Sequence, residues 1–528
     1  MEKITRRYLF IFIFLFPVFA WAFIHETLPS WHWAYGFIDE LRLRGCFEEL
    51  YAMNRPYTRG EVAKALVQTE SQLKERKLSL TSSDLKLLEK FVKEFQVEMR
   101  EFEGKIPEKD EVRLGVRLQS DVDKSENDKA KYRGVYRSKF SVSLGNYVEV
   151  YNGTNFDQYL IDDTIYIGRK WRGIVGYTEQ AYATVGVGRF RFKFGRDFLS
   201  WGTGESGTLL FSDVARPMDQ FIAFATMGSF QFTFLVSALD DITLDSKTAD
   251  SLGGSFAKRY ISAHRIDVNL INGRFQCAVT GAVLYGGVNR QLNWIFLNPF
   301  IFYHGAQLNN SGSANTFGTV DLSFSPVSRW ELYGSLLIDD IQIEKICPDD
   351  LEPNEIGWLL GSHLGDPFGV SGLTLSGEFV CVTNRTYKTP NPWETFIHRN
   401  KPLGYPLGND FDYWQIGISK WFRGSLWLGL RYSQTRKGEG SLFTPWDAPW
   451  LDYTIEQGYS EPFPTGVVEK RREVSFSALY YPSIHWGIEG EILSLQRENA
   501  YNVEGKSNNE INWRVGIWFD GDFKFRMK

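Results

Sequence analysis

The stretch Phe190-Arg-Phe-Lys-Phe194 decides the fold, together with the glycine-rich run that follows it, Gly195-Arg-Asp-Phe-Leu-Ser-Trp-Gly-Thr-Gly-Glu-Ser-Gly-Thr-Leu-Leu-Phe-Ser-Asp213. Aromatic residues alternate with cations, and a period of two indicates a β-strand whose two faces meet different environments, one apolar and one aqueous. If the strand continued, Arg196 would share the aromatic face, where a charge costs about 2–4 kcal/mol at the bilayer midplane. We therefore expect the chain to bend, bulge or leave the apolar band at Gly195.

The same alternation recurs from Val112 to the end of the chain. Apolar Ile266, Val268 and Leu270 alternate with polar residues, and Asn272-Gly273, a pair suited to a type I′ turn, follows them. Segmentation gives roughly 16 to 18 strands, within the even-numbered range of bacterial barrels. Tight turns alternate with long polar loops, which in such barrels lie outside the cell; the long loops are near 200–218, 240–257, 286–314, 342–356, 385–410 and 437–466. The sequence predicts a membrane all-β fold, a closed antiparallel outer-membrane β-barrel over residues 108–528.

The N-terminus has the features of an export signal. Lys3, Arg6 and Arg7 precede an apolar run, and Ala20-Trp21-Ala22 is a small-x-small cleavage site. The run is shorter than the roughly 20 residues that a spanning helix needs. Residues 1–22 are therefore predicted to be a signal peptide.

Residues 23–107 are predicted to form a small helical periplasmic domain. A first helix ends at Gly45, and Thr58 caps a second, with Glu61 completing a capping box. Apolar residues then recur every three or four positions over 81–103, which indicates an amphipathic helix. We expect this helix to form a packed hairpin with residues 59–78.

Composition excludes several functions. The formal net charge is −5, which argues against nucleic acid as a partner because backbone binding needs clustered Lys and Arg. The seven histidines and four cysteines have no metal-ligand spacing, so no metal or cofactor is predicted. Gly202-x-Gly204-x-x-Gly207 matches a dinucleotide fingerprint only formally, since no helical period follows it. No Gly-x-Ser-x-Gly motif is present in this segment, and no catalytic residues are assigned.

Three groups of residues resemble the Wzi family of outer-membrane capsule-assembly proteins. The first is Gly-Arg-x4-Trp-Gly-x-Gly from Gly195, leading to Asp213; the second is Asn298-Pro299; the third runs from Phe396-Ile-His398 through Pro402-Leu-Gly404 to Gly408-Asn-Asp410. The similarity covers roughly residues 110–528 and departs from the family at Asn400-Lys401. It implies a non-enzymatic barrel that organises surface polysaccharide, with its helices against the periplasmic mouth.

The resemblance also indicates positions for the site. They are family-motif or polysaccharide-binding residues near the outer rim or lumen: Arg196, Trp201, Gly202, Gly204, Asp213, Asn298, His398 and Asp410. Each has a purely structural alternative, in which Arg196, for example, pairs with an inward carboxylate such as Asp213. The loops are rich in Trp, Tyr, Asn and Asp, which suit sugars because aromatic rings pack on their C–H faces and planar groups bind their hydroxyls.

Residues 28–66 resemble a single surface-layer homology (SLH) module. This resemblance implies contact with a peptidoglycan-linked polymer through Arg55, Thr58, Arg59 and Glu61. The alternative is that these residues only begin and cap a helix. For the whole chain, the leading hypothesis is an outer-membrane barrel that binds or organises capsular polysaccharide, with periplasmic helices that contact the cell wall or plug the barrel. The partners that this hypothesis predicts are surface polysaccharide, outer-membrane lipid and a peptidoglycan-linked polymer. The alternatives are a cell-wall-tethered porin and an outer-membrane hydrolase.

Overall fold

The computed structural model describes residues 26–105, 110–126, 129–145, 147–163, 166, 168–310 and 313–526. The predicted signal peptide, residues 1–22, and the predicted domain boundary at 107–108 lie outside these ranges. Among the described helices, none has both the length and the apolar character needed to cross a bilayer.

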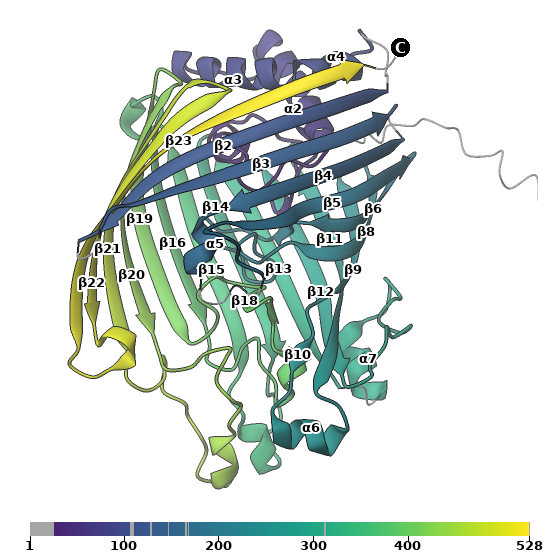
Figure 1. The fold of residues 1–528 in the computed structure, drawn as a ribbon, viewed down its shortest axis with the longest axis vertical. Helices are drawn as coiled ribbons and strands as arrows, with labels where there is room; N and C mark the ends of the chain where they lie inside the picture. The colour runs from purple at the N-terminus through teal and green to yellow at the C-terminus, as the bar shows by residue number, and fades with distance from the viewer. Residues whose placement is uncertain are drawn as a thin grey trace, which may run out of the picture.

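In the described residues, eighteen strands form one closed antiparallel barrel, as predicted (Figure 1). A short strand, β10 (Ile242–Thr243), extends the sheet beside β11. The wall strands are β2 (Glu111–Ser125), β3 (Lys131–Leu144), β4 (Val148–Asp157), β5 (Val175–Val187), β6 (Phe190–Asp197), β8 (Met218–Met227), β9 (Phe230–Ala238), β11 (Phe256–Leu270), β12 (Phe275–Gly287), β13 (Ala314–Val327), β14 (Trp330–Asp340), β15 (Glu355–Gly365), β16 (Leu373–Val382), β19 (Phe411–Phe422), β20 (Leu426–Lys437), β21 (Glu469–Ser483), β22 (Trp486–Glu498) and β23 (Ser507–Arg526).

The first and last wall strands close the barrel. β2 pairs with β23 from Glu111 opposite Arg526 to Ser125 opposite Asn512. The alternation read from the sequence decides which face meets lipid: Phe194 exposes 71% of its surface, whereas Lys193 exposes 4% and points into the lumen. Because a strand reverses its side chains at every residue, one period-two pattern gives both an apolar outside and a polar lumen.

The helices lie across the end of the barrel where β23 finishes (Figure 1). They are α1 (Ala34–Leu43), α2 (Arg59–Lys74), α3 (Ser82–Glu94) and α4 (Gln96–Phe102). Thr58 caps α2 in the predicted capping box, with the Thr58 hydroxyl accepting from the Glu61 amide and the Glu61 carboxylate accepting from the Thr58 amide. The helix predicted over 81–103 is interrupted at Phe95, where the backbone leaves helical geometry, so two helices form instead of one.

Smaller elements occupy the connections. They are β1 (Asn54–Arg55), β7 (Ser200–Trp201), β17 (Ile397–His398), β18 (Lys401–Pro402), α5 (Tyr159–Asp162), α6 (Ser246–Leu252), α7 (Tyr303–Asn310), and the 3₁₀ turns η1 (Pro348–Leu351), η2 (Pro367–Gly369), η3 (Pro392–Glu394), η4 (Pro449–Asp452) and η5 (Ala500–Asn502). All four cysteines lie in described residues and are free thiols.

The long connections lie at the rim opposite the helices, as predicted, but two of them do not project outward. Residues 198–217, between β6 and β8, and residues 383–410, between β16 and β19, supply much of the largest buried apolar cluster of the protein. The expectation of polar outer loops near 200–218 and 385–410 is therefore wrong. Their apolar side chains, such as Leu209, Phe211 and Phe396, are buried inside the barrel, where they are removed from water.

Candidate functional site

The lumen contains an inner layer made by the two infolded connections. Trp201 packs edge-on against Phe211, with ring centroids 5.2 Å apart, and its backbone amide donates to the Phe211 carbonyl. The second connection joins this layer where the Ser212 amide donates to the Leu403 carbonyl at 2.8 Å. Arg259 of the wall strand β11 binds this second connection: its guanidinium donates to the carbonyls of residues 393, 395 and 397. A buried arginine of the wall thereby donates hydrogen bonds to three backbone carbonyls of the second connection.

The N-terminal segment reaches this inner layer through the lumen. β1 pairs antiparallel with β7, Asn54 opposite Trp201, and the Gly202 amide donates to the Met53 carbonyl at 2.9 Å. Gly202 has a φ of +124°, in the region that favours glycine because a Cβ is disfavoured there. The N-terminal segment and the inner layer are therefore hydrogen-bonded to each other.

The helices form a second layer at the short-turn rim. Phe37 of α1 packs on two barrel aromatics, Trp421 at 4.5 Å and Tyr481 at 5.4 Å between ring centroids. Between the two layers lies a chamber of about 350 Å³, lined by Gly202 and Gly204 from one side and by Arg42 of α1 from the other. The lumen is thus crossed twice.

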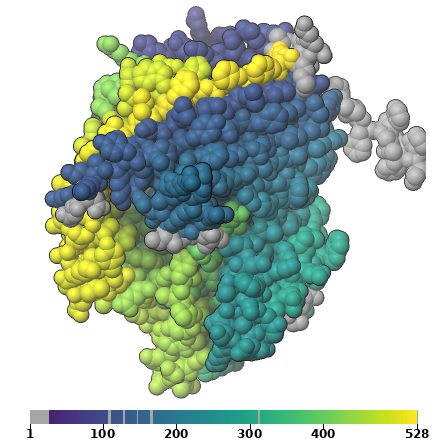
Figure 2. All heavy atoms as spheres, viewed as in Figure 1, coloured from purple at the N-terminus to yellow at the C-terminus, as the bar shows by residue number. Residues whose placement is uncertain are grey.

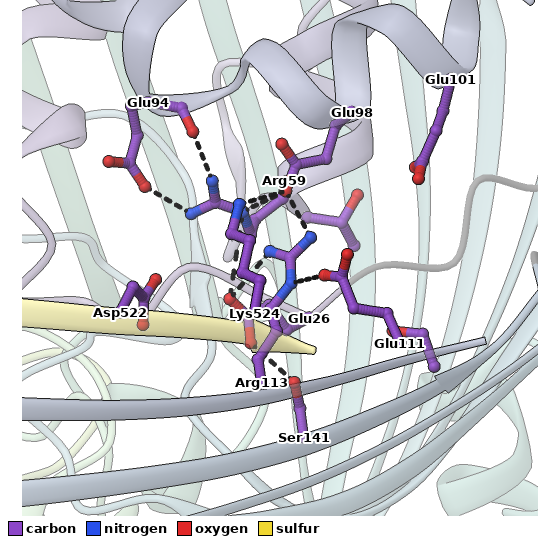
Figure 3. Close-up of polar contacts among 12 residues, drawn as sticks. Glu26, Arg59, Glu94, Glu98, Glu101, Glu111, Arg113, Ser141, Asp522 and Lys524 are labelled. Carbon is purple, nitrogen blue, oxygen red and sulfur yellow. Dashed lines mark hydrogen bonds and ion pairs between the residues drawn. The ribbon is translucent and has the colours of Figure 1, made fainter. Parts of the chain in front are cut away.

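A buried ion cluster joins the helices to the barrel seam (Figure 3). Arg59 of α2 binds Glu98 of α4 at 2.7 Å and Glu94 of α3 at 2.6 Å. Glu98 also binds Arg113 of β2 at 2.8 Å, and Arg113 lies opposite Lys524 of β23 in the closing register. The cluster therefore ties three helices to the two strands that close the barrel.

The electrostatics of this cluster favour the charged state of its carboxylates. Burial is the largest single effect and by itself would raise the pKa of Glu94, but Arg59, His32 and Lys139 together outweigh it and the pKa falls to about 2. Burial likewise opposes ionisation of Glu26, and Lys139, Arg113 and Arg59 hold its pKa at about 2. Removing one partner from such a buried set leaves an uncompensated charge, which is strongly destabilising.

The structure places several predicted site residues in the interior. Trp201, Gly202 and Gly204 belong to the inner layer. His398 is buried, and its Nδ1 lies 3.0 Å from a carboxylate oxygen of Asp240. Asp410 is fully buried and accepts from the amides of residues 440 and 465 at 2.7 and 2.9 Å. These residues hold connections in place inside the protein.

The remaining motif positions do not gather with them. Arg196 lies on the outward face of β6 and binds Asp219 through two hydrogen bonds of 2.8 and 2.6 Å. The expectation that Arg196 pairs with Asp213 is therefore wrong, because its side chain points away from the lumen at the long-loop end of the strand. Asp213 is exposed, and Asn298 is exposed in the connection between β12 and β13.

The residues predicted to contact the cell wall are mostly engaged within the protein. Thr58 and Arg59 expose about 1% of their surface, the first in the helix cap and the second in the ion cluster. Arg55 pairs with Asp39, and Glu61 pairs with Arg191 of the wall at 2.8 Å.

Sequence reasoning missed a cavity of about 350 Å³ at the long-loop end, which we call the outer cavity. Three connections line it: residues 342–354, residues 383–384 and residues 459–463. The aromatic and amide side chains of these loops were the available signal, but the sequence could not bring three connections together. In the described residues no cluster of His, Cys, Asp and Glu is arranged to hold a metal.

The sequence model of the family described as "Capsule assembly protein Wzi" matches residues 118–510, well over half of the chain. The chain belongs to the Wzi family. It is therefore a capsule-assembly barrel of the outer membrane, with its helices at the periplasmic end. The match begins after the SLH-like stretch, so that resemblance stays a prediction.

Solved structures of three outer-membrane proteins are similar to this chain. Escherichia coli Wzi, described as a carbohydrate-binding β-barrel involved in group 1 capsule assembly, is 13% identical, with 92% of this chain and 97% of that chain covered and a TM-score of 0.58. Pseudomonas aeruginosa OpdK is 12% identical over 78% of this chain and 99% of that chain, with a TM-score of 0.45. OprD of the same organism is 10% identical over 78% and 95%, with a TM-score of 0.44. No curated protein matches the chain in sequence.

Replacing Arg59 with alanine should loosen the helices while the barrel stays folded. Leaving Glu94 and Glu98 buried without their partner costs about 3–5 kcal/mol, so α2 to α4 should become sensitive to protease. Lys64→Ala is the matched control on the same helix, because Lys64 and its partner Glu49 are both about half exposed and such pairs contribute roughly 0–1 kcal/mol. Heat-modifiable electrophoretic migration reports the barrel. Equal protease resistance of the two variants would contradict a docking role for the cluster.

Acid should undock the helices. The folded-state pKa values of Glu26 and Glu94 lie at about 2, below their ordinary value of 4.5, so their contribution is complete above about pH 4.5 and is lost as the pH falls toward 2. Burial also lowers the pKa of His32 from 6.5 to about 3, so the weakening begins near pH 6.5. Hydrogen exchange of α2 and α4 measured between pH 7 and 3 should accelerate relative to that of β13. A constant ratio across this range would refute the assignment.

Proposed function

We propose that this Wzi-family protein binds polysaccharide at the outer end of a barrel that passes no solutes. The observation that carries the proposal is the double crossing of the lumen by the inner layer and the helices, joined through β1 and β7. In a barrel filled in this way, a ligand can bind at the outer surface but has no open route through the lumen. Of the two roles predicted for the helices, plugging the barrel is the one we propose, since Arg59 is committed to the ion cluster.

The outer cavity is the proposed glycan site. Its wall combines the rings of Tyr459 and Phe463 with the amides of Asn354 and Asn384, which supply an apolar platform beside planar hydrogen-bonding groups. Its volume of about 350 Å³ falls in the usual range of ligand sites, about 300–1,000 Å³. E. coli Wzi is described as carbohydrate-binding, which supports a sugar as the ligand here.

The charges of the outer cavity favour a neutral or amine-bearing sugar over an acidic one. Three carboxylates line it, from Asp350, Glu352 and Glu461, against the single cation Lys345. Asp350 accepts from the amides of residues 346 and 347, and Glu461 binds Arg385 at 3.0 Å. Burial and the neighbouring Asp340 raise the pKa of Glu352 to about 7, so this carboxyl is partly protonated near neutral pH. Because carboxylates still outnumber cations in the lining, a uronic acid would meet like charge here, and like charge disfavours binding.

Tyr459→Ala should weaken binding of neutral polysaccharide roughly tenfold, since losing an aromatic contact of about 1.4 kcal/mol corresponds to that factor. Tyr501→Ala is the matched control, because Tyr501 is exposed on another outer connection and does not line the cavity. The measurement is titration of detergent-solubilised protein with neutral, amine-bearing and uronic-acid polysaccharides. Unchanged binding in Tyr459→Ala, or an equal loss in Tyr501→Ala, would place the site elsewhere.

The porin alternative is decided by conductance. Purified full-length protein inserted into planar bilayers should give no stable current steps, because the inner layer and the helical layer both cross the lumen. Heat-modifiable migration of the same sample serves as the control for folding. Stable channels from folded protein would contradict the closed barrel and favour a solute pore.

A further inference from the structure

The connection between β12 and β13 folds back over the outside of the barrel. We call residues 291–309 of this connection the wall segment; it includes most of α7, which lies outside the wall beyond β12 (Figure 1) and forms part of the teal surface at the right of Figure 2. Phe296 and Tyr303 of the segment are buried against Val283 and Tyr285 of β12. Both of these β12 residues face outward by alternation with Val279, yet neither is exposed. The wall segment therefore covers part of the outer surface of the barrel and does not enter the lumen.

The wall segment is continuous with the lipid-facing surface. Phe300 stacks on Phe232 of β9, with ring centroids 5.6 Å apart and planes 14° apart. Phe232 lies in one register row with the outward-facing Ile266 and Val279, which expose 47% and 56% of their surface. One turn along the segment, Tyr303 stacks on the outward-facing His264 of β11 at 4.6 Å. The segment thus reaches into the apolar band that meets the membrane.

The exposed side chains of the wall segment, which we call its free face, are strongly apolar. Trp294, Phe300, Phe302 and Leu308 expose between 71% and 85% of their surface. Residues 288–310 contain no Asp, Glu or Lys, and Arg290 is the single arginine. Soluble surfaces seldom expose such a patch, whereas helices that lie in a membrane interface present Trp, Phe and Leu to lipid. By contrast, the exposed Ile343 and Leu451 of two other outer connections each have a carboxylate beside them in the sequence, Glu344 and Asp452.

From this continuity and charge pattern we propose that the wall segment is an interfacial anchor, which inserts its free face into the outer leaflet of the membrane. Its occupant is lipid, at the boundary of headgroups and acyl chains. Asn298 stabilises the bend that brings Phe300 onto Phe232, because its side-chain oxygen accepts from the Phe300 amide at 3.1 Å. The anchor is independent of the proposed glycan site.

Spin-label accessibility in vesicles of phosphatidylethanolamine and phosphatidylglycerol tests the anchor. Nitroxides are attached at Trp294→Cys and, separately, at Leu308→Cys, in full-length protein whose four native cysteines are replaced. Val279→Cys is the lipid-facing reference and Phe443→Cys, in another outer connection, is the aqueous reference. Heat-modifiable migration confirms that each variant is folded.

The expected result is that labels at 294 and 308 collide several-fold more often with oxygen, relative to a nickel chelate, than the label at 443, and approach the ratio at 279. A ratio equal to that at 443 would overturn the anchor and leave the segment in water. Protection from both reagents would also overturn it, because lipid admits oxygen and only a protein surface, such as a second copy of this chain, excludes both.

Discussion

The structure depends on the need to satisfy the polar groups that the wall directs into a filled lumen, where they are buried. Arg259, Arg265 and Gln276 face inward and are almost completely buried, and buried polar groups are costly unless they are paired. Arg265 binds Asp267 and Asp321 and donates to the Met53 carbonyl. Gln276 accepts from the Ala52 amide and donates to the Leu50 carbonyl. The inward-facing side chains of the wall and the N-terminal segment that crosses the lumen therefore fix each other's positions.

The same principle operates at the seam. Residues 26–105 come before β2 in the chain, and their charged side chains meet β2 and β23 where the barrel closes. Arg113 and Lys524 lie side by side in the closing register, and like charges there are balanced by Glu98 of α4 at 2.8 and 3.9 Å. Because each partner is buried, docking of the helices and closure of the seam stabilise one another. A domain that looks separable in sequence is structurally part of the barrel.

The outer end of the protein divides its contacts between two connections of different chemistry. The outer cavity is lined by carboxylates, amides and aromatic rings, which suits a hydrated and hydroxyl-rich polymer. The wall segment has a nearly uncharged, aromatic free face beside the lipid-facing row. In this arrangement a glycan held at the rim would lie close to the membrane surface, with the barrel fixed in the outer leaflet on at least one side.

The sequence by itself determined the local structure. A period of two gave the strands, their two faces and the barrel, since side-chain direction in a strand depends only on position. The cap at Thr58 was equally local. What only the tertiary structure decided was where the connections go and which charges meet. Arg259 binds carbonyls more than 130 residues away in the sequence. Arg196 pairs with Asp219 and not with Asp213. Arg59 is buried and binds Glu98. No local pattern encodes these pairings, because each exists only once the barrel has closed and brought distant residues to the same buried place.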